Sequence, residues 1–344
     1  MSRFRQEIAE QPAVAERVLG SAAEPVRTAA AAIAAAEPAG LVIAARGSSD
    51  HAAVYAKYLF ETRNGLPVAL AAPSTFTLYR RPPRLQRFAV LAISQAGASP
   101  DVVEVLSEAR RQGSVTVALT NHPDSALARA AEHVVQLGAG EELSVPATKT
   151  YTATLLVLAM LSDALSPEPA FTAALGRIPR ALRSVLDAET ALSGLAGELV
   201  AATRLAVLGR GYNLATALEV GLKLMEAAYV VAEARSVADF RHGPIAIVEP
   251  GFPALLLQAA GPAAADLDEL GADLDRRGAR VLSIGEGAGQ PPGRLSVRLD
   301  TGLPEALTPL TLAAAGQLVT AGLARARGLH PDRPRGLRKV TSTR

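Results

Sequence analysis

Short apolar segments alternate along most of the chain with longer segments of helical periodicity. Apolar runs predict strands at 41–45, 67–71, 88–93, 114–119, 133–137, 205–209, 254–258, 280–284 and 295–299. Between them, apolar positions spaced three and four residues apart predict helices at 50–63, 101–112, 125–130, 148–165, 214–232, 264–277 and 307–327. Strands that alternate with helices in this way are typical of parallel sheets covered on both faces, so the predicted fold class is α/β.

The same pattern divides the chain into five parts. An alanine-rich helical segment, broken near Pro12 and Pro25, precedes the first strand, and Pro167 and Pro169 follow the last helix of the first sheet. The predicted parts are an N-terminal helical segment 1–36, a first domain 37–166, a connecting helix 167–202, a second domain 203–327 and a C-terminal tail 328–344. The tail is rich in Pro, Arg and Thr, which by composition alone predicts disorder.

Two of the apolar runs end in Arg-Gly and then open a helix. The sequence RGSS at 46–49 follows the first run, and RGYN at 210–213 follows a run that lies 164 residues later. A strand that ends at glycine before a helix presents free backbone N–H groups and the positive end of the helix dipole, which suits an anion. Because 88–99 and 253–261 keep nearly the same offset, the chain is predicted to contain a duplicated α/β unit.

The two copies differ in their hydroxyl groups. The first copy has serines at both strand ends, and the second copy has lost them; these serines are Ser48, Ser49, Ser94 and Ser99. Ligands of parallel sheets bind at the carboxyl ends of the strands, near the point where the strand order reverses. We therefore predict one phosphate site, built mainly by the first half with help from the Gln95 amide. The alternative for Ser99, which precedes a proline, is an ordinary helix N-cap.

Charged residues are rare in the predicted helix that begins at 213. They are Glu219, Lys223 and Glu226, and the spacing i, i+4, i+7 places them on one stripe of an apolar helix. Such a stripe needs charged partners or a solvated cleft. It is either a structural ladder that faces another subunit or a site where partial burial raises the pKa of Glu226, so that this residue can transfer protons.

Two further residues have settings that point to a ligand site. His242 follows Glu226 by sixteen residues and lies in a turn closed by Gly-Pro, which restricts its backbone. Lys149 opens a predicted helix, where a cation is unfavourable unless an anion is nearby. Lone histidines are more often structural, so His242 alone does not define a site.

Composition restricts the class of protein further. The 344 residues suffice for two domains, and 35 Lys and Arg against 33 Asp and Glu provide no strong field for nucleic acid. The absence of cysteine excludes thiol nucleophiles and zinc–thiolate sites, and no His and acid combination has metal-ligand spacing. The chain has neither a run of 18 strongly apolar residues nor a secretory signal, so we expect a cytoplasmic protein without a membrane segment.

An ordered series of motifs resembles the sugar isomerase (SIS) family over essentially the whole chain. The motifs are RGSS at 46–49, ISQAG at 93–97, PATKT at 146–150, ALEVGLKLME at 217–226, RHGP at 241–244 and PRGLRKVT at 334–341. Within the family, the chain most resembles the isomerase half of glutamine–fructose-6-phosphate aminotransferase and the SIS-type glucosamine-6-phosphate deaminases.

The resemblance implies a role for each matching residue. The expected substrate-binding residues, most of them around the phosphate, are Gly47, Ser48, Ser49, Ser94, Gln95, Ser99, Val145, Thr148 and Glu219. Glu226 would move a proton between C1 and C2 of the sugar, with Lys223 assisting from the same helix. His242 would open the sugar ring and would come from the neighbouring subunit. Lys339 would belong to a tail that closes over the substrate. The resemblance therefore predicts an active-site lid where composition alone predicts disorder.

Three positions depart from the family pattern. Ala96 and Ala147 stand where serine is common, and Met225 stands where lysine is common beside the catalytic glutamate. The residues that the resemblance expects to transfer protons are all present. The three departures instead bear on which sugar phosphate fits the site.

Together these features predict two SIS-type units, each a mostly parallel sheet flanked by helices, in a homodimer with shared active sites. The expected reaction converts glucosamine 6-phosphate to fructose 6-phosphate and ammonia without a cofactor or metal. Because no cysteine is present, we expect no glutaminase activity. The alternatives are a deglycase that acts on a fructosamine 6-phosphate and a non-catalytic sugar-phosphate sensor. Neither nucleic acid nor a membrane is an expected partner.

Overall fold

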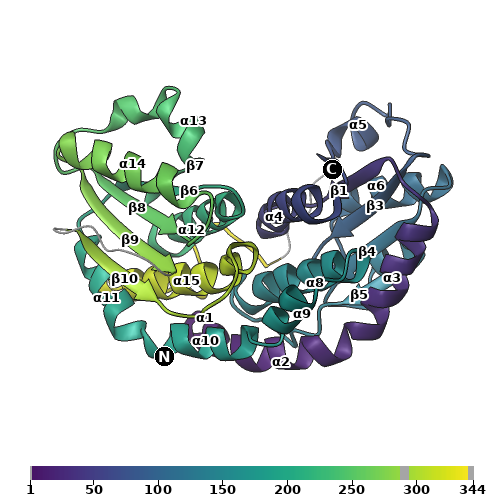
Figure 1. The fold of residues 1–344 in the computed structure, drawn as a ribbon, viewed down its shortest axis with the longest axis horizontal. Coiled ribbons are helices and arrows are strands. Elements are labelled where there is room, and N and C mark those ends of the chain that lie inside the picture. The colour runs from purple at the N-terminus through teal and green to yellow at the C-terminus, as the bar shows by residue number, and fades with distance from the viewer. Residues whose placement is uncertain (1, 287–293, 340–344) are drawn as a thin grey trace. The chain divides into compact units, whose positions relative to one another are not determined.

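Two parallel sheets of five strands each form the centres of the computed structural model, in which residues 2–286 and 294–339 are described (Figure 1). The chain divides into two compact units. The described residues of the N-sheet unit are 13–142, 149–176 and 338–339. Those of the C-sheet unit are 2–12, 143–148, 177–286 and 294–337.

The N-sheet unit has the strand order β2-β1-β3-β4-β5. Its strands are β1 (Gly40–Ala44), β2 (Val68–Leu70), β3 (Phe88–Ile93), β4 (Thr116–Thr120) and β5 (His133–Gln136). One face of the sheet carries α3 (Ala23–Ala35), α4 (Ser48–Asn64) and α8 (Lys149–Leu165), and the other carries α6 (Pro100–Arg111) and α7 (Ala126–Ala130). Helix α2 (Gln11–Ser21) leads into the unit, and α5 (Ser74–Thr77) and α9 (Pro169–Leu175) complete it.

The C-sheet unit has the strand order β10-β9-β8-β6-β7. Its strands are β6 (Arg204–Gly209), β7 (Val231–Ser236), β8 (Pro253–Gln258), β9 (Arg280–Glu286) and β10 (Leu295–Leu299). One face carries α11 (Glu189–Glu198), α12 (Asn213–Ala228) and α15 (Thr308–Ala326), and the other carries α13 (Val237–Arg241) and α14 (Ala264–Arg276). The remaining helices are α1 (Arg3–Ala9), α10 (Ile178–Asp187), η1 (Pro244–Ile247) and η2 (Glu305–Leu307).

The two sheets repeat one topology, which confirms the predicted α/β duplication. Strands β6 to β10 occupy the same places in their sheet as β1 to β5 occupy in theirs. In each unit the first strand lies between the second and the third, so the chain leaves β1 and β3, and likewise β6 and β8, on opposite sides. The carboxyl ends of these strand pairs are therefore the two topological switch points of the chain.

Close packing of apolar helices forms one part of the core of the C-sheet unit, and the other part lies between the sheet and α13 and α14. Helix α15 packs on α12 so closely that a Cβ added to Gly316 would overlap the Val220 side chain. The segment Glu305–Ala326 has the length and composition of a membrane span, yet 94% of its apolar window is buried within the fold. Within the part of the chain that the structure describes, this segment is therefore a buried core helix.

One predicted helix ends early and is followed by a strand that the apolar pattern did not reveal. The helix predicted to continue to Ala232 ends at Ala228, because Tyr229 adopts a left-handed conformation (φ 55°) and donates its N–H to the Leu224 carbonyl. The chain then forms β7, which pairs in parallel with β6. The sequence analysis did not predict this strand. Since β7 is the counterpart of β2, the repeat offset was the signal that could have revealed it.

The helical linkers also differ from the predictions. The N-terminal helix breaks after Ala9 and Ser21, and the two prolines lie in the first turns of the helices that follow, where a missing N–H costs no hydrogen bond. The single connecting helix predicted over 167–202 consists of α9, α10 and α11.

The tail is ordered as far as it is described, so the composition-based prediction of disorder is wrong there. Asp332 accepts hydrogen bonds from the backbone N–H groups of Arg3 (3.0 Å) and Phe4 (2.8 Å), at the start of α1. Residue 1, predicted to belong to the N-terminal helical segment, and residues 340–344, which include the Val-Thr end of the last motif, lie outside the described residues.

Candidate functional site

The switch point of the N-sheet unit carries most of the predicted phosphate-binding residues. Gly47 follows β1 with φ 56° and ψ −132°, a conformation open to glycine alone, and an added Cβ would meet nothing within 4 Å. Ser48 and Ser49 form the first turn of α4. Ser94 and Gln95 follow β3, whose Leu91 is in register with Ile43 of β1. The structure thus brings these residues to neighbouring strand ends, and we call this set, with Ser99, the cradle.

Ser99 occupies the N-cap position of α6, but its hydroxyl makes no capping hydrogen bond. The ordinary N-cap interpretation therefore does not explain this serine. The turn before it is held tightly: Gly97 has φ 60°, and a Cβ added there would overlap the Ser125 side chain and lie 2.9 Å from Thr120 Oγ1. The Gln95 carbonyl accepts from the Asn121 N–H (3.0 Å), which ties the same turn to the end of β4.

An ion pair closes the base of the cradle. The Arg46 Nε donates to the buried Asp101 carboxylate (2.7 Å), so the end of β1 is joined to the first turn of α6. Nearby, burial raises the pKa of the Asp50 carboxyl in α4, although His51 and Arg46 act in the opposite direction. The cradle therefore combines backbone donors, hydroxyls and one guanidinium, a donor set suited to an anion.

The corresponding place in the C-sheet unit is filled by a side chain. The ion pair recurs, with Arg210 Nε donating to Asp266 (2.9 Å), and Gly211 recurs with φ 59°. At the end of β8, however, a Cβ added to Gly261 would overlap the Glu305 carboxylate, whose pKa is raised by burial. An internal carboxylate thus lies at the strand end of the C-sheet unit that corresponds to the cradle.

Helix α12 of the C-sheet unit brings the three predicted charged residues together as a buried cluster. Lys223 Nζ lies 3.3 Å from Glu219 Oε1 and 2.6 Å from Glu226 Oε2. The exposed fractions of the Glu219, Lys223 and Glu226 side chains are 0%, 1% and 18%. Burial favours a neutral Lys223, but the two carboxylates outweigh it, so the pKa of Lys223 is raised and the residue stays an ammonium. The stripe therefore has two fully buried members and one carboxylate that reaches solvent.

His242 lies apart from this cluster. It follows α13 directly, is exposed, and within the described part of the unit no hydrogen bond or ion pair joins it to Glu226. The neighbouring segment exposes apolar surface, including Ile247.

The predicted residues Val145 and Thr148 lie in the loop before α8. The Val145 N–H donates to the Asp332 carbonyl (3.2 Å), and the Thr148 carbonyl accepts from Gln317 Nε2 (3.5 Å). Glu7 of α1 accepts from the Leu143 N–H (2.5 Å) and from the Ser144 N–H (3.2 Å) and hydroxyl. Sequence reasoning missed Glu7 and Asp332, because both act on segments far away in the chain.

Lys339, the lysine predicted to belong to the lid, is held by a residue that sequence reasoning also missed. Its Nζ donates to Glu142 Oε2 (2.7 Å) within the N-sheet unit. Glu142 also accepts from the N–H of Thr150, in the first turn of α8. The unfavourable position of Lys149 at that helix start was a signal for such an anion, because a carboxylate there stabilises the helix terminus.

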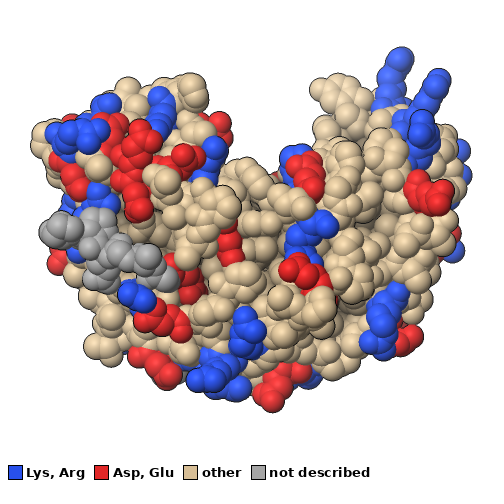
Figure 2. Space-filling view, viewed as in Figure 1, with Lys and Arg blue, Asp and Glu red and all other residues tan. Residues whose placement is uncertain are grey.

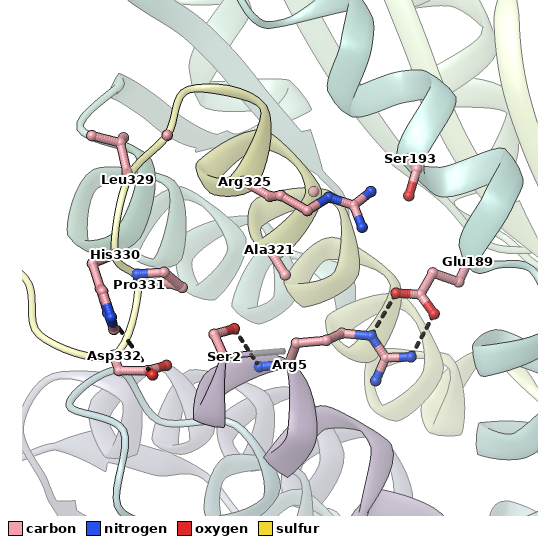
Figure 3. A pocket seen from close by; sticks show the side chains of 12 residues that line it. Ser2, Arg5, Glu189, Ser193, Ala321, Arg325, Leu329, His330, Pro331 and Asp332 are labelled. Carbon is pink, nitrogen blue, oxygen red and sulfur yellow. Dashed lines mark hydrogen bonds and ion pairs between the residues drawn. The ribbon is translucent and has the colours of Figure 1, made fainter.

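The C-sheet unit contains a cavity of about 760 Å³, lined by residues at the start of the chain, in α11, in α15 and in the tail (Figure 3). Arg5 and Glu189 form a two-point ion pair on one side, and Asp332 and His330 of the tail lie on the other. None of the residues predicted to bind or convert a substrate lines it.

Surface charge is mixed on the visible face, with acidic and basic side chains interspersed (Figure 2). The segment after α5 is locally basic, because Arg80, Arg81 and Arg84 are exposed there. Across residues 2–286 and 294–339, no group of three or more His, Asp or Glu side chains could hold a metal ion.

Two parallel sheets of one topology, each with a glycine turn at its switch point, define a duplicated α/β protein. The chain belongs to the SIS domain family, whose sequence profile matches residues 36–163 and 198–321.

Known proteins of this kind are similar to the chain in sequence and in structure. The glutamine–fructose-6-phosphate aminotransferase (isomerizing) of Methanothermobacter thermautotrophicus is 31% identical over 299 residues, which are 86% of this chain and 50% of that protein. The chain thus spans about half the length of the curated relatives it matches. The crystal structure of a provisionally named phosphosugar isomerase from Silicibacter pomeroyi DSS-3 is 36% identical with a TM-score of 0.88, covering 96% of this chain and 100% of that one. Glucosamine-6-phosphate deaminase from Thermotoga maritima, 21% identical with a TM-score of 0.79 and coverage of 99% and 100%, shares the fold.

Proposed function

We propose that the chain is an enzyme of the phosphosugar isomerase type that converts glucosamine 6-phosphate and water to fructose 6-phosphate and ammonia. The observation that carries this proposal is the cluster on α12, in which a buried ammonium lies 2.6 Å from the partly exposed Glu226 carboxylate. A phosphate-binding protein has no need of such a cluster, whereas proton transfer between neighbouring carbons requires a carboxylate held in its basic form.

In the proposed reaction, the cradle binds the phosphate through backbone N–H groups and the hydroxyls of Ser49, Ser94 and Ser99. This step is supported by the glycine turn at Gly47 and by a Ser99 hydroxyl that does not cap its own helix. Phosphate binding fixes the register of the sugar and adds binding energy remote from the reacting carbons.

The chemistry is assigned to the acid–base residues. His242 transfers the protons that open the ring, which gives the C1 aldehyde. Glu226 removes the proton from C2 while the C1 oxygen takes up a proton, which gives an enolamine. Glu226 then returns its proton to C1 while the nitrogen loses one, so that C2 becomes a ketimine. Water adds to this ketimine, the C–N bond breaks, and ammonia leaves with fructose 6-phosphate. Lys223, an ammonium because of its raised pKa, places a positive charge 2.6 Å from the Glu226 carboxylate.

The proposal places His242 in the active site of a second copy of the chain. His242 is exposed, no hydrogen bond or ion pair joins it to Glu226 within the described part of the unit, and apolar surface lies beside it at Ile247. A homodimer would cover that surface and complete both sites.

The test is an assay of fructose 6-phosphate and ammonia released from glucosamine 6-phosphate. We expect equal amounts of both products from the native chain, none from Glu226→Gln, and native rates from Glu233→Gln, a matched change at a glutamate paired with Arg235 on β7. Release from fructosamine 6-phosphate alone would identify a deglycase instead. Phosphate-dependent thermal stabilisation without turnover of either substrate would identify a sensor.

A further inference from the structure

Glu142 is a buried carboxylate at the start of α8. Its side chain has no exposed surface, and it accepts hydrogen bonds from the Thr150 N–H (3.1 Å) and the Thr150 hydroxyl (2.7 Å). Helix α8 is buried along nearly its whole length, so the carboxylate is attached to one of the most rigid parts of the N-sheet unit. A carboxylate with no access to water needs an opposite charge and further donors to remain ionised.

The tail supplies such a charge. Lys339 reaches Glu142 with an Nζ–Oε2 distance of 2.7 Å, although the two residues are 197 positions apart in the chain. The Lys339 side chain is about one-quarter exposed, while its partner is fully buried. The geometry is therefore that of a tail lysine held by a buried anion, and not that of an ion pair between two exposed side chains.

We infer that Glu142 is the positioning residue for Lys339. It holds the ammonium of the tail at one point of the N-sheet unit and thereby sets where this lysine can act on a substrate. The inference rests on the proposed function, because it takes Lys339 to be the tail residue that reaches the sugar. It adds that the position of this residue is determined by Glu142 and α8, and not by the tail itself.

A double-mutant cycle tests the inference. Glu142→Gln keeps the size of the side chain but removes the charge, and Lys339→Met removes the ammonium. We expect Glu142→Gln to lower kcat/KM about 100-fold in the native background, the size of effect that a displacement of about 1 Å produces. In the Lys339→Met background the same change should alter kcat/KM by less than about twofold, because nothing is left to position.

Stability and a matched control separate positioning from general damage. Thr150→Val removes a hydroxyl donor to the same carboxylate but keeps its charge, so kcat/KM should stay within about threefold of the native value. The Tm of each variant, measured beside kcat/KM, shows whether a loss of activity follows from a loss of stability. If Glu142→Gln does not fold, Glu142→Asp, which withdraws the carboxylate by one methylene, takes its place in the cycle.

A second measurement does not depend on activity. Trypsin should cleave after Lys339 more readily when this residue leaves its partner. Glu142→Gln should therefore accelerate cleavage after Lys339 at least tenfold relative to cleavage after the exposed Arg338, measured by intact mass, while Thr150→Val should not. Equal losses of kcat/KM in both backgrounds, or unchanged cleavage, would overturn the inference. Accelerated cleavage in a chain that converts no sugar phosphate would support the contact between Lys339 and Glu142 and refute the proposed function alone.

Discussion

Arg46 and Asp101 form an ion pair of 2.7 Å that joins the end of β1 to the start of α6, and Arg210 and Asp266 repeat it at 2.9 Å in the C-sheet unit. The two pairs differ in burial. Asp101 has no exposed side-chain surface, whereas Asp266 is about half exposed. The first pair therefore compensates a buried charge beneath the cradle, and the second is a surface pair.

The difference in burial predicts different losses when the arginines are removed. Arg46→Met should lower the free energy of unfolding by about 2–3 kcal/mol, because Asp101 is left with the Val102 N–H alone in a buried place. Arg210→Met should cost less than about 1 kcal/mol, as expected for an exposed pair. Urea denaturation of both variants measures the two values, and equal losses would show that burial of Asp101 does not matter.

Crowding at Gly97 should be visible beside a glycine that has room. Gly97→Ala would push a Cβ into the Ser125 side chain, whereas Gly113, also at positive φ (84°), has nothing within 4 Å. Gly97→Ala and Gly113→Ala both carry backbone strain. We therefore expect Gly97→Ala to be less stable than Gly113→Ala by about 2 kcal/mol, which is the additional cost of overpacking. Thermal unfolding of the pair measures this difference, and similar Tm values would argue against a tightly held cradle turn.

Burial of Glu286 predicts how the stability of the fold changes with pH. Burial raises the pKa of this carboxyl, although hydrogen bonds from Thr301 and Thr311 act to lower it. The folded state therefore keeps a proton that the unfolded chain has lost, and the contribution of Glu286 to stability falls as pH rises from about 4.3 through the folded pKa.

Glu286→Gln removes this titration. The stability of the variant relative to the native chain should therefore increase with pH over the same interval and become constant above it. Denaturation of the native chain and the variant at a series of pH values gives the difference curve. A difference that decreases with pH would contradict the assignment.

Arg327 joins the ends of three helices of the C-sheet unit, α11, α12 and α15. Its guanidinium donates to the carbonyls of Val200 (3.0 Å), Ala228 (2.8 Å) and Leu199 (3.1 Å) and to that of Ala202, and burial lowers its pKa. Arg327→Met should cost about 2–4 kcal/mol, because four carbonyls, three of them in partly buried hydrogen bonds, lose their donor together. The exposed Arg325 makes none of these bonds, so Arg325→Met should change stability by less than about 0.5 kcal/mol. Similar losses in the two variants would show that these carbonyls find other donors.

The fold could be predicted from the sequence wherever the repeat and the apolar pattern agreed. Strand β3 was predicted with its observed bounds, because its apolar run lies between polar turns. Strand β7 could not be recognised from hydrophobicity, since the residues after Ala228 suit a helix or a strand equally. The left-handed Tyr229 ends the helix, and no glycine or proline signals that end.

The candidate site was predictable only in its local parts. Glu219, Lys223 and Glu226 meet because helical spacing brings them together, and helical spacing can be read from a sequence. The contacts of Glu142 with Lys339 and of Glu7 with Ser144 join residues more than 130 positions apart. Neither periodicity nor composition reports such contacts, because they depend on how separate segments fold onto one another.

The most direct test of the central claim is the rate at which solvent hydrogen enters the sugar. Fructose 6-phosphate and ammonia, incubated with the chain in D₂O, should exchange a C1 hydrogen for deuterium, followed by proton NMR. If Glu226 is the proton-transfer group, Glu226→Gln should slow this exchange at least about 100-fold, while Glu233→Gln should not. Exchange at the native rate in Glu226→Gln would contradict the account and assign the proton transfer to another residue.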